Sequence, residues 1–213
     1  VALLTLQAIN YRSGCRQDIR AITDLARSFG ILVVWDCSHA VGSIQLDLDA
    51  NGVDLAVGCT YKYGNSGPGS PAWLYVRKEL QRELRVPIQG WFAQEKQFEM
   101  GPFFEPSAEI RRFQIASPSI IGIRGVEVAF EMIRDAGMAN IEAKAAVGTQ
   151  LMIQLTSQWL TELGFTLATP EDPSMRGGHI ILKHKDAKQI ALALRKLKKV
   201  IPDYREPGAI RLA

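Results

Sequence analysis

The sequence has 213 residues, a net charge of +3, 47% hydrophobic residues and 22% charged residues, which is an ordinary globular composition. The charge is too small to indicate nucleic acid, and no apolar run approaches the roughly 20 residues of a membrane span, so neither partner is expected. Cys15, Cys37 and Cys59 lack CxxC spacing. They predict free thiols in a reducing, cytoplasmic compartment rather than disulfides or a metal site.

The first part of the chain predicts strands that alternate with a helix. Residues 1–9 form an apolar run that suits a buried strand, and residues 18–29 have the apolar spacing of a helix. Residues 31–35 and 54–59 are short, continuous apolar strands, and residues 72–76 form a further strand after a glycine-rich loop. Continuous apolar strands separated by a helix indicate a parallel sheet that is covered on both faces.

The later part of the chain predicts helices and then a smaller unit. Residues 122–163 have helical spacing with a break near Gly137. Residues 179–183 resemble a strand, residues 186–200 an amphipathic helix, and residues 209–213 a returning strand. These elements predict a second, smaller βαβ unit.

The change in pattern predicts two domains. Residues 1–135 are expected to be part of a large α/β domain, and residues 136–213 a small, incomplete C-terminal α+β domain. The chain begins inside an apolar run and ends inside a predicted strand. We therefore interpret it as truncated at both ends.

Asp36 is the first candidate functional residue. It ends the apolar run Ile31–Trp35, and the carboxyl ends of parallel strands are where open α/β sheets bind ligands. Taken alone, Asp36 is better interpreted as a helix cap or turn residue, and His39, three residues later, as a structural histidine.

Lys62 is the second candidate. It lies between Tyr61 and Tyr63, directly after a predicted buried strand and before a stretch with three glycines. Partial burial favours the neutral amine, which is a nucleophile. The alternative is a surface lysine before a flexible loop. The stretch lacks Walker spacing, which argues against a nucleotide P-loop.

Asp36 and Lys62 are more informative together. Adjacent parallel strands are expected to present both at one edge of the sheet. A pyridoxal-phosphate (PLP) enzyme needs a lysine that holds the cofactor aldehyde and a carboxylate that keeps the pyridine nitrogen protonated. The pair therefore predicts PLP as the cofactor.

Several motifs in chain order resemble those of kynureninases, which are class V, fold type I PLP enzymes. They are Asn-Tyr-Arg-Ser-Gly at 10–14, Trp-Asp-Cys-Ser-His-Ala-Val-Gly at 35–42, Thr-Tyr-Lys-Tyr at 60–63, Gly-Trp-Phe at 90–92 and Arg-Glu-Pro-Gly-Ala-Ile-Arg-Leu-Ala at 205–213. The resemblance covers nearly the whole chain. It implies a fold type I PLP-dependent transferase-like fold, with a mainly parallel sheet in the large domain.

The resemblance also implies roles in cofactor binding. Lys62 would form the Schiff base, and Asp36 would pair with the pyridine nitrogen. His39 would lie in the cofactor pocket. Tyr61 would contact the cofactor phosphate and serve in proton transfer.

Three further positions match the family's site. Trp91 would reach the phosphate region of a neighbouring subunit, which implies a homodimer with shared active sites. Ser117 stands at a cofactor-binding position of the family. Arg211 would clamp the α-carboxylate of an amino-acid substrate, because its planar fork suits a bidentate contact.

The implied reaction is hydrolysis of the Cβ–Cγ bond of kynurenine or 3-hydroxykynurenine to anthranilate or its hydroxylated form and alanine. This reaction belongs to tryptophan catabolism and NAD biosynthesis. One alternative is a related class V PLP lyase such as a cysteine desulfurase, which needs a nucleophilic cysteine on a mobile loop. Another is a non-catalytic relative that keeps the fold for dimerisation.

The sequence departs from the family pattern at three positions. Gln94 stands where the family commonly has His, Ser117 where it has Asn or Thr, and Gln7 where it has a small hydroxyl residue. These changes predict altered contacts around the substrate and cofactor, with PLP binding retained.

Overall fold

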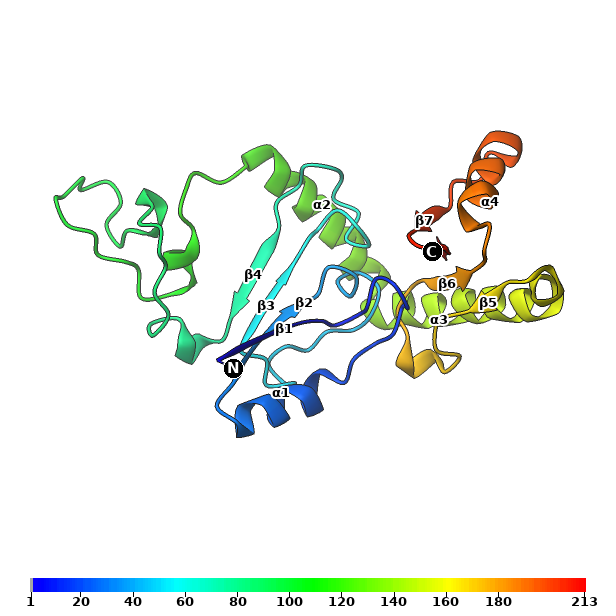
Figure 1. The fold of residues 1–213 in the computed structure, drawn as a ribbon. Coiled ribbons are helices and arrows are strands. Elements are labelled where there is room, and N and C mark those ends of the chain that lie inside the picture. The colour runs from blue at the N-terminus through cyan, green and yellow to red at the C-terminus, as the bar shows by residue number, and fades with distance from the viewer. Residues whose placement is uncertain (1) are drawn as a thin grey trace.

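A parallel sheet with one reversed edge strand forms the first half of the molecule. The computed structural model describes residues 2–213, so Val1, which the first predicted strand includes, lies outside the described residues. The strands are β1 (Leu3–Gln7), β2 (Leu32–Asp36), β3 (Leu55–Gly58) and β4 (Trp73–Val76), in that order across the sheet (Figure 1). β1, β2 and β3 run parallel, whereas β4 pairs antiparallel with β3. The predicted strands are confirmed.

Helix α1 (Ile19–Ser28) connects β1 to β2 and covers one side of the sheet (Figure 1). Asp18 caps it by accepting a hydrogen bond from the Ala21 backbone N–H at 2.9 Å. The buried Trp35 indole donates to the Thr23 hydroxyl at 2.9 Å, which fixes the helix on β2. The core beneath the helix is made of small and β-branched residues around Trp35, among them Ala8, Val33, Val53 and Ala56.

Two long helices follow, as the spacing predicts. α2 (Ile120–Ala136) and α3 (Met138–Leu155) are separated by Gly137 at φ +81°, a left-handed backbone conformation that favours glycine. No helix among residues 2–213 is long and apolar enough to cross a membrane.

Short helical turns complete the connections. The 3₁₀ turns are Lys78–Leu80, Trp91–Ala93, Ile110–Phe113, Thr161–Leu163 and Pro173–Met175, and the π turns are Thr156–Leu160 and Leu194–Lys198. The first three lie in an arm, residues 77–119, that projects away from β4 (Figure 1).

A small antiparallel sheet lies at the other end of the molecule. Its strands are β5 (Thr166–Leu167), β6 (Ile180–Lys183), β8 (Ala209–Leu212) and β7 (Asp203–Arg205), in that order. Helix α4 (Ala187–Ala193) packs on it through Ala187 and Ala191 against Ile210. The prediction of a βαβ unit, in which the two strands run parallel, is wrong. β8 pairs antiparallel with β6, and an additional strand, β7, lies between α4 and β8 in the chain.

The segment before β6 attaches the small sheet to the large one. Arg16 N–H donates to the Met175 carbonyl at 2.8 Å, and Gly177 N–H donates to the Gly14 carbonyl at 2.9 Å. A Cβ at Gly14, which has φ +71°, would lie 2.7 Å from the His179 carbonyl oxygen. The two segments are therefore in close backbone contact, which places residue 179 against the loop that follows β1.

Arg176 is the central hydrogen-bonding side chain of this attachment. Its side chain is buried, and its Nε donates to Thr149 Oγ1 at 2.9 Å and its Nη2 to Gln150 Oε1 at 2.9 Å. Further donors reach the backbone carbonyls of residues 146, 170 and 171. The guanidinium is thus satisfied by neutral acceptors on α3 and on the loop before β6.

The predicted domain division at residue 135 falls one residue before the end of α2. It stays a prediction.

Candidate active site

Asp36 and Lys62 lie at the carboxyl edge of the parallel sheet. Asp36 is the last residue of β2, where it pairs with Val57 of β3, and Lys62 follows the end of β3 by four residues. Asp36 Oδ1 accepts a hydrogen bond from the Ser38 backbone N–H at 2.8 Å. Among residues 2–213, neither side chain has an oppositely charged group within ion-pair distance.

The loop that carries Lys62 is packed tightly by glycines. A Cβ at Gly42 would lie 2.4 Å from the Tyr63 carbonyl oxygen, and a Cβ at Gly64 would lie 2.3 Å from the Thr60 carbonyl oxygen. Real Cβ atoms do not come this close to backbone, so these two positions need glycine. The Lys62 loop is therefore held against the loop after β2.

His39 lies between these two groups and the small sheet. Its Nε2 is 3.0 Å from Arg211 Nη1, and its ring stacks on Tyr11 with centroids 6.5 Å apart. Burial, together with the positive charges of Lys62 and Arg211, lowers the pKa of His39 to about 4, although the negative charge of Asp36 acts in the opposite direction. His39 is thus neutral at pH 7.

Arg211, on β8, brings the small sheet into this site. Its side chain is 17% exposed, and its Nη2 pairs with Asp203 Oδ2, which also accepts from Arg205 Nη2 at 2.6 Å. The structure therefore brings Arg211 to His39, although 172 positions separate them in the sequence.

His179 and Tyr63 are site residues that carry no role in the sequence prediction. His179 is fully buried, its ring centroid lies 5.7 Å from that of His39, and its Nδ1 is 3.5 Å from the Tyr63 hydroxyl. Its Nε2 has no hydrogen-bond partner among the described residues. Burial lowers the pKa of His179 to about 4, helped by the charge of Arg211. The glycine pair at 177–178 before a histidine is the one sequence signal that could have found it.

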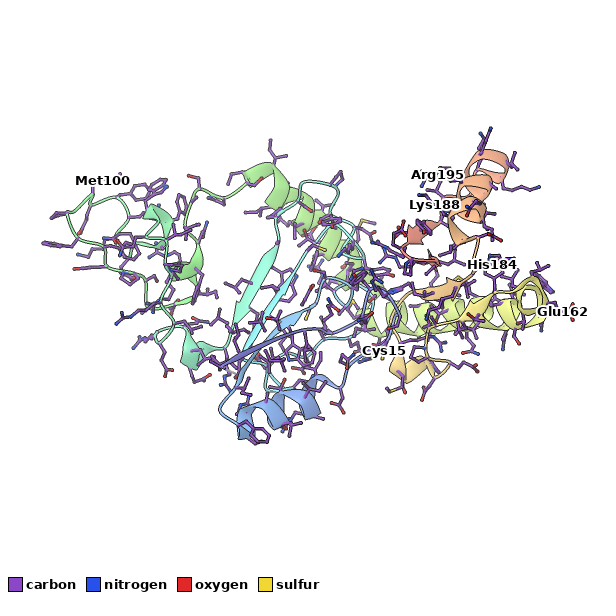
Figure 2. The ribbon with its side chains drawn as sticks, in the orientation of Figure 1. Cys15, Met100, Glu162, His184, Lys188 and Arg195 are labelled. Atoms are coloured by element: carbon purple, nitrogen blue, oxygen red, sulfur yellow. The ribbon has the colours of Figure 1, made fainter. Side chains whose placement is uncertain are left out.

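The remaining predicted site residues lie apart from this cluster or at its edge. Tyr61 is exposed, and its ring lies 5.7 Å from Lys62 Nζ. Trp91 lies in the projecting arm, where it packs edge-on against Phe92 and Phe98. Ser117 is exposed near the last residue of the arm, shortly before α2 begins. Figure 2 shows Met100 at the outer end of this arm, whereas Cys15 lies near the junction of the two sheets.

Gln94 has a structural role that the sequence does not reveal. Its Nε2 donates to the Phe103 carbonyl at 3.1 Å, and its Oε1 accepts from the Glu105 N–H at 2.7 Å. The side-chain amide thus closes the outer loop of the arm.

The chemistry of these groups fits a cofactor that has both an aldehyde and a basic ring nitrogen. A lysine amine and a carboxylate lie at one sheet edge, neither of them in an ion pair among the described residues, and a neutral imidazole lies beside them. An amine condenses with an aldehyde, and a carboxylate stabilises a protonated ring nitrogen. The residues of the site therefore fit PLP, which has both of these groups.

Comparison with solved structures defines the fold class. A cysteine desulfurase from Thermococcus onnurineus NA1 matches with a TM-score of 0.82 at 17% identity, over 100% of this chain and 55% of that one. The cystine C-S lyase C-DES matches with a TM-score of 0.85 at 16% identity, over 100% and 56%. The fold is that of the class V aminotransferase-fold proteins, as the sequence predicts.

Sequence comparison narrows the relationship. Kynureninases from Pseudomonas fluorescens and Geobacillus thermodenitrificans are 36% and 38% identical to this chain, over 99% and 100% of its length. The family model of the kynureninase C-terminal domain matches residues 141–213. The chain is kynureninase-like along its whole length, and it spans about half the length of the curated relatives it matches.

Proposed function

We propose that the protein is a PLP-dependent hydrolase that cleaves the Cβ–Cγ bond of kynurenine or 3-hydroxykynurenine. The observation that carries the proposal is the joint placement of Lys62, Asp36 and Arg211 around His39. The similarity to kynureninases supports the choice of substrate. We further propose that the protein acts in the cytoplasm.

When bound, PLP supplies an electron sink for the electrons that leave the substrate carbon next to the amino group. Lys62 Nζ would hold the cofactor and, once released by the substrate, take the proton from the substrate Cα. Asp36 would hold the proton on the ring nitrogen through its carboxylate, while its Oδ1 stays fixed by the Ser38 N–H.

Arg211 would bind the substrate α-carboxylate through parallel N–H donors. His39 would line the cofactor pocket as a neutral ring, because its pKa of about 4 keeps it uncharged at pH 7. Tyr61, which is exposed beside Lys62, would reach the cofactor phosphate and assist proton transfer.

Trp91 and Ser117 belong to the projecting arm, which fits a role in a second copy of the chain. The arm carries large apolar side chains in solvent, with Phe98 and Phe103 77% and 79% exposed. We propose a homodimer in which Trp91 and Ser117 complete the partner's cofactor site.

A product assay tests the proposal. Purified holoenzyme is mixed with kynurenine or 3-hydroxykynurenine, and release of anthranilate or its hydroxylated form is followed by fluorescence and chromatography. Release of either product together with alanine is expected. If neither aromatic product forms, the hydrolase assignment fails even where PLP is bound.

A cysteine desulfurase remains the second candidate because the fold matches one. That reaction needs a thiolate, and burial, together with the charge of Asp36, raises the pKa of Cys37 to about 12. Cys37 is therefore a poor nucleophile. The same holoenzyme with L-cysteine should release no sulfide.

A further inference from the structure

Five side chains, Arg211 among them, form a closed ring of contacts between the loops that follow β1 and β2 and the strands β7 and β8. Tyr11 stacks on His39, His39 Nε2 faces Arg211 Nη1 at 3.0 Å, and Arg211 Nη2 pairs with Asp203. Asp203 accepts from Arg205, whose Cζ lies 5.8 Å from the centre of the Tyr11 ring. Asp203 is the one anion in this ring.

Strand geometry fixes Asp203 in this place. Asp203 on β7 lies directly opposite Arg211 on β8, and Arg205 lies two residues further along the same face of β7. Opposite charges at directly paired positions attract across a sheet. Asp203 thus holds Arg211 from one side while Arg205 holds Asp203 from the other, through its Nε at 3.1 Å and Nη2 at 2.6 Å.

His39 holds Arg211 from the second side. A guanidinium can only donate, so His39 Nε2 must present its lone pair, and the ring proton must lie on Nδ1. Arg211 is therefore fixed by two acceptors, one charged and one neutral.

These two contacts leave the guanidinium able to bind a ligand. Arg211 carries five N–H donors and directs one to His39 and one to Asp203, so three remain. A bidentate carboxylate needs only two of them. Asp203 therefore does not block Arg211; it restricts the directions in which the free donors point.

We infer that Asp203 is a positioning residue, which holds Arg211 so that its free donors meet the carboxylate of an α-amino acid. The inference rests on the proposed function, since it assigns to Arg211 the substrate carboxylate. Asp203 itself touches neither substrate nor cofactor in this role.

The sign of one substitution separates positioning from simple charge. Asp203→Asn removes a negative charge beside the carboxylate site, which by electrostatics alone should tighten the binding of an anionic ligand. The same change weakens the hold on Arg211, because a charge-assisted hydrogen bond becomes a neutral one. Positioning therefore predicts weaker binding where charge alone predicts stronger binding.

The experiment is a titration of the PLP absorption band of the purified holoenzyme with L-alanine and with ethylamine, which lacks the carboxylate. Asp203→Asn should weaken alanine binding about tenfold, on the order of the difference between a charge-assisted and a neutral hydrogen bond, and leave ethylamine binding unchanged. The matched control is Asp186→Asn, the same change at an exposed residue of the same domain, which should alter neither. Thermal unfolding of each variant verifies that the fold is kept.

Each outcome decides one question. Alanine binding that is equal or tighter in Asp203→Asn overturns the inference, and so does an equal loss for alanine and ethylamine, which indicates general damage. If the unmodified protein shows a PLP band but no response to alanine, the proposed function fails, and this inference fails with it.

Discussion

At the scale of single residues, Lys62 is the group on which cofactor binding depends. It lies at the sheet edge with no acidic partner among the described residues, so its amine is free to react. We expect Lys62→Ala to lose the absorption band of lysine-bound PLP, because no other residue is proposed to reach the aldehyde. The control Lys185→Ala, at an exposed position, should keep the band. An unchanged band in Lys62→Ala would contradict the assignment.

Asp36 can be tested separately from folding. Its Oδ1 accepts from the Ser38 N–H, and the amide oxygen of Asn can accept the same bond, so Asp36→Asn should keep the loop intact. The amide cannot keep a ring nitrogen protonated, so we expect PLP to stay bound while turnover falls at least a hundredfold, on the order of what general acid–base groups contribute. Turnover near that of the unmodified protein would reduce Asp36 to a turn residue.

His179 should make stability depend on pH. Its pKa is lowered by burial to about 4 in the folded protein, below the ordinary value of 6.5, so unfolding takes up a proton between these values. The free energy of unfolding should therefore fall as pH drops from 6.5 to about 4, by about 1.4 kcal/mol per pH unit for one proton. Denaturant titrations across this range should show a flatter dependence for His179→Gln. Parallel curves for both proteins would contradict the burial argument.

At the scale of elements, the loop that carries Lys62 depends on close backbone contact. A Cβ at Gly64 would meet the Thr60 carbonyl at 2.3 Å, so Gly64→Ala must push the loop apart, at about 1–3 kcal/mol. Gly148→Ala is the matched control, since a Cβ there meets nothing within 4 Å inside α3 and alanine favours helix. In thermal unfolding, the melting temperature should fall for Gly64→Ala and rise slightly for Gly148→Ala. Equal melting temperatures would show that the loop relaxes freely.

The elements themselves could largely be predicted from the sequence. Continuous apolar runs located β1 to β4, and the spacing around Gly137 located the break between α2 and α3. β5 and β7, of two and three residues, are too short for a periodic signal. The direction of β8 depends on its pairing with β6, which local sequence does not encode.

The candidate site was only partly predictable for a related reason. Asp36, Lys62 and His39 lie at or shortly after strand ends, where position alone suggests ligand binding, and motif resemblance adds Arg211. His179 and Asp203 gain their roles only from contacts made across the two sheets. Such contacts arise from tertiary packing, and apart from the glycine pair at 177–178 no local pattern indicates either residue.

At the scale of the whole molecule, Glu142 connects α3 to the segments that follow β1 and β2. Its Oε1 accepts from Arg16 Nη1 at 2.6 Å and its Oε2 from the Gln45 N–H at 2.8 Å. Burial acts to raise the pKa of Glu142, but these hydrogen bonds outweigh it and hold the pKa below the ordinary value of 4.5. The carboxylate therefore stabilises the fold above pH 4.5, and this contribution is lost as pH falls through the lowered pKa.

We accordingly expect Glu142→Gln to lower the melting temperature at pH 7 by a few degrees. The difference from the unmodified protein should shrink as the pH falls below 4.5, because the carboxylate of the unfolded chain takes up a proton first and that of the folded protein follows at its lowered pKa. Calorimetry of the two proteins at pH 7 and at pH 3.5 measures this. A difference that is constant with pH would assign the effect to packing.

The burial of Arg176 has a consequence for how this protein can change during evolution. Three of its five acceptors are backbone carbonyls, at residues 146, 170 and 171, and a carbonyl is supplied by every amino acid. Mutations at these three positions can accumulate without removing an acceptor. Position 176 itself is closed even to lysine, whose single ammonium cannot reach acceptors that a planar fork spans. The attachment between the two sheets thus constrains position 176 and the two side-chain acceptors Thr149 and Gln150, and it leaves the three positions that supply only backbone carbonyls free to vary.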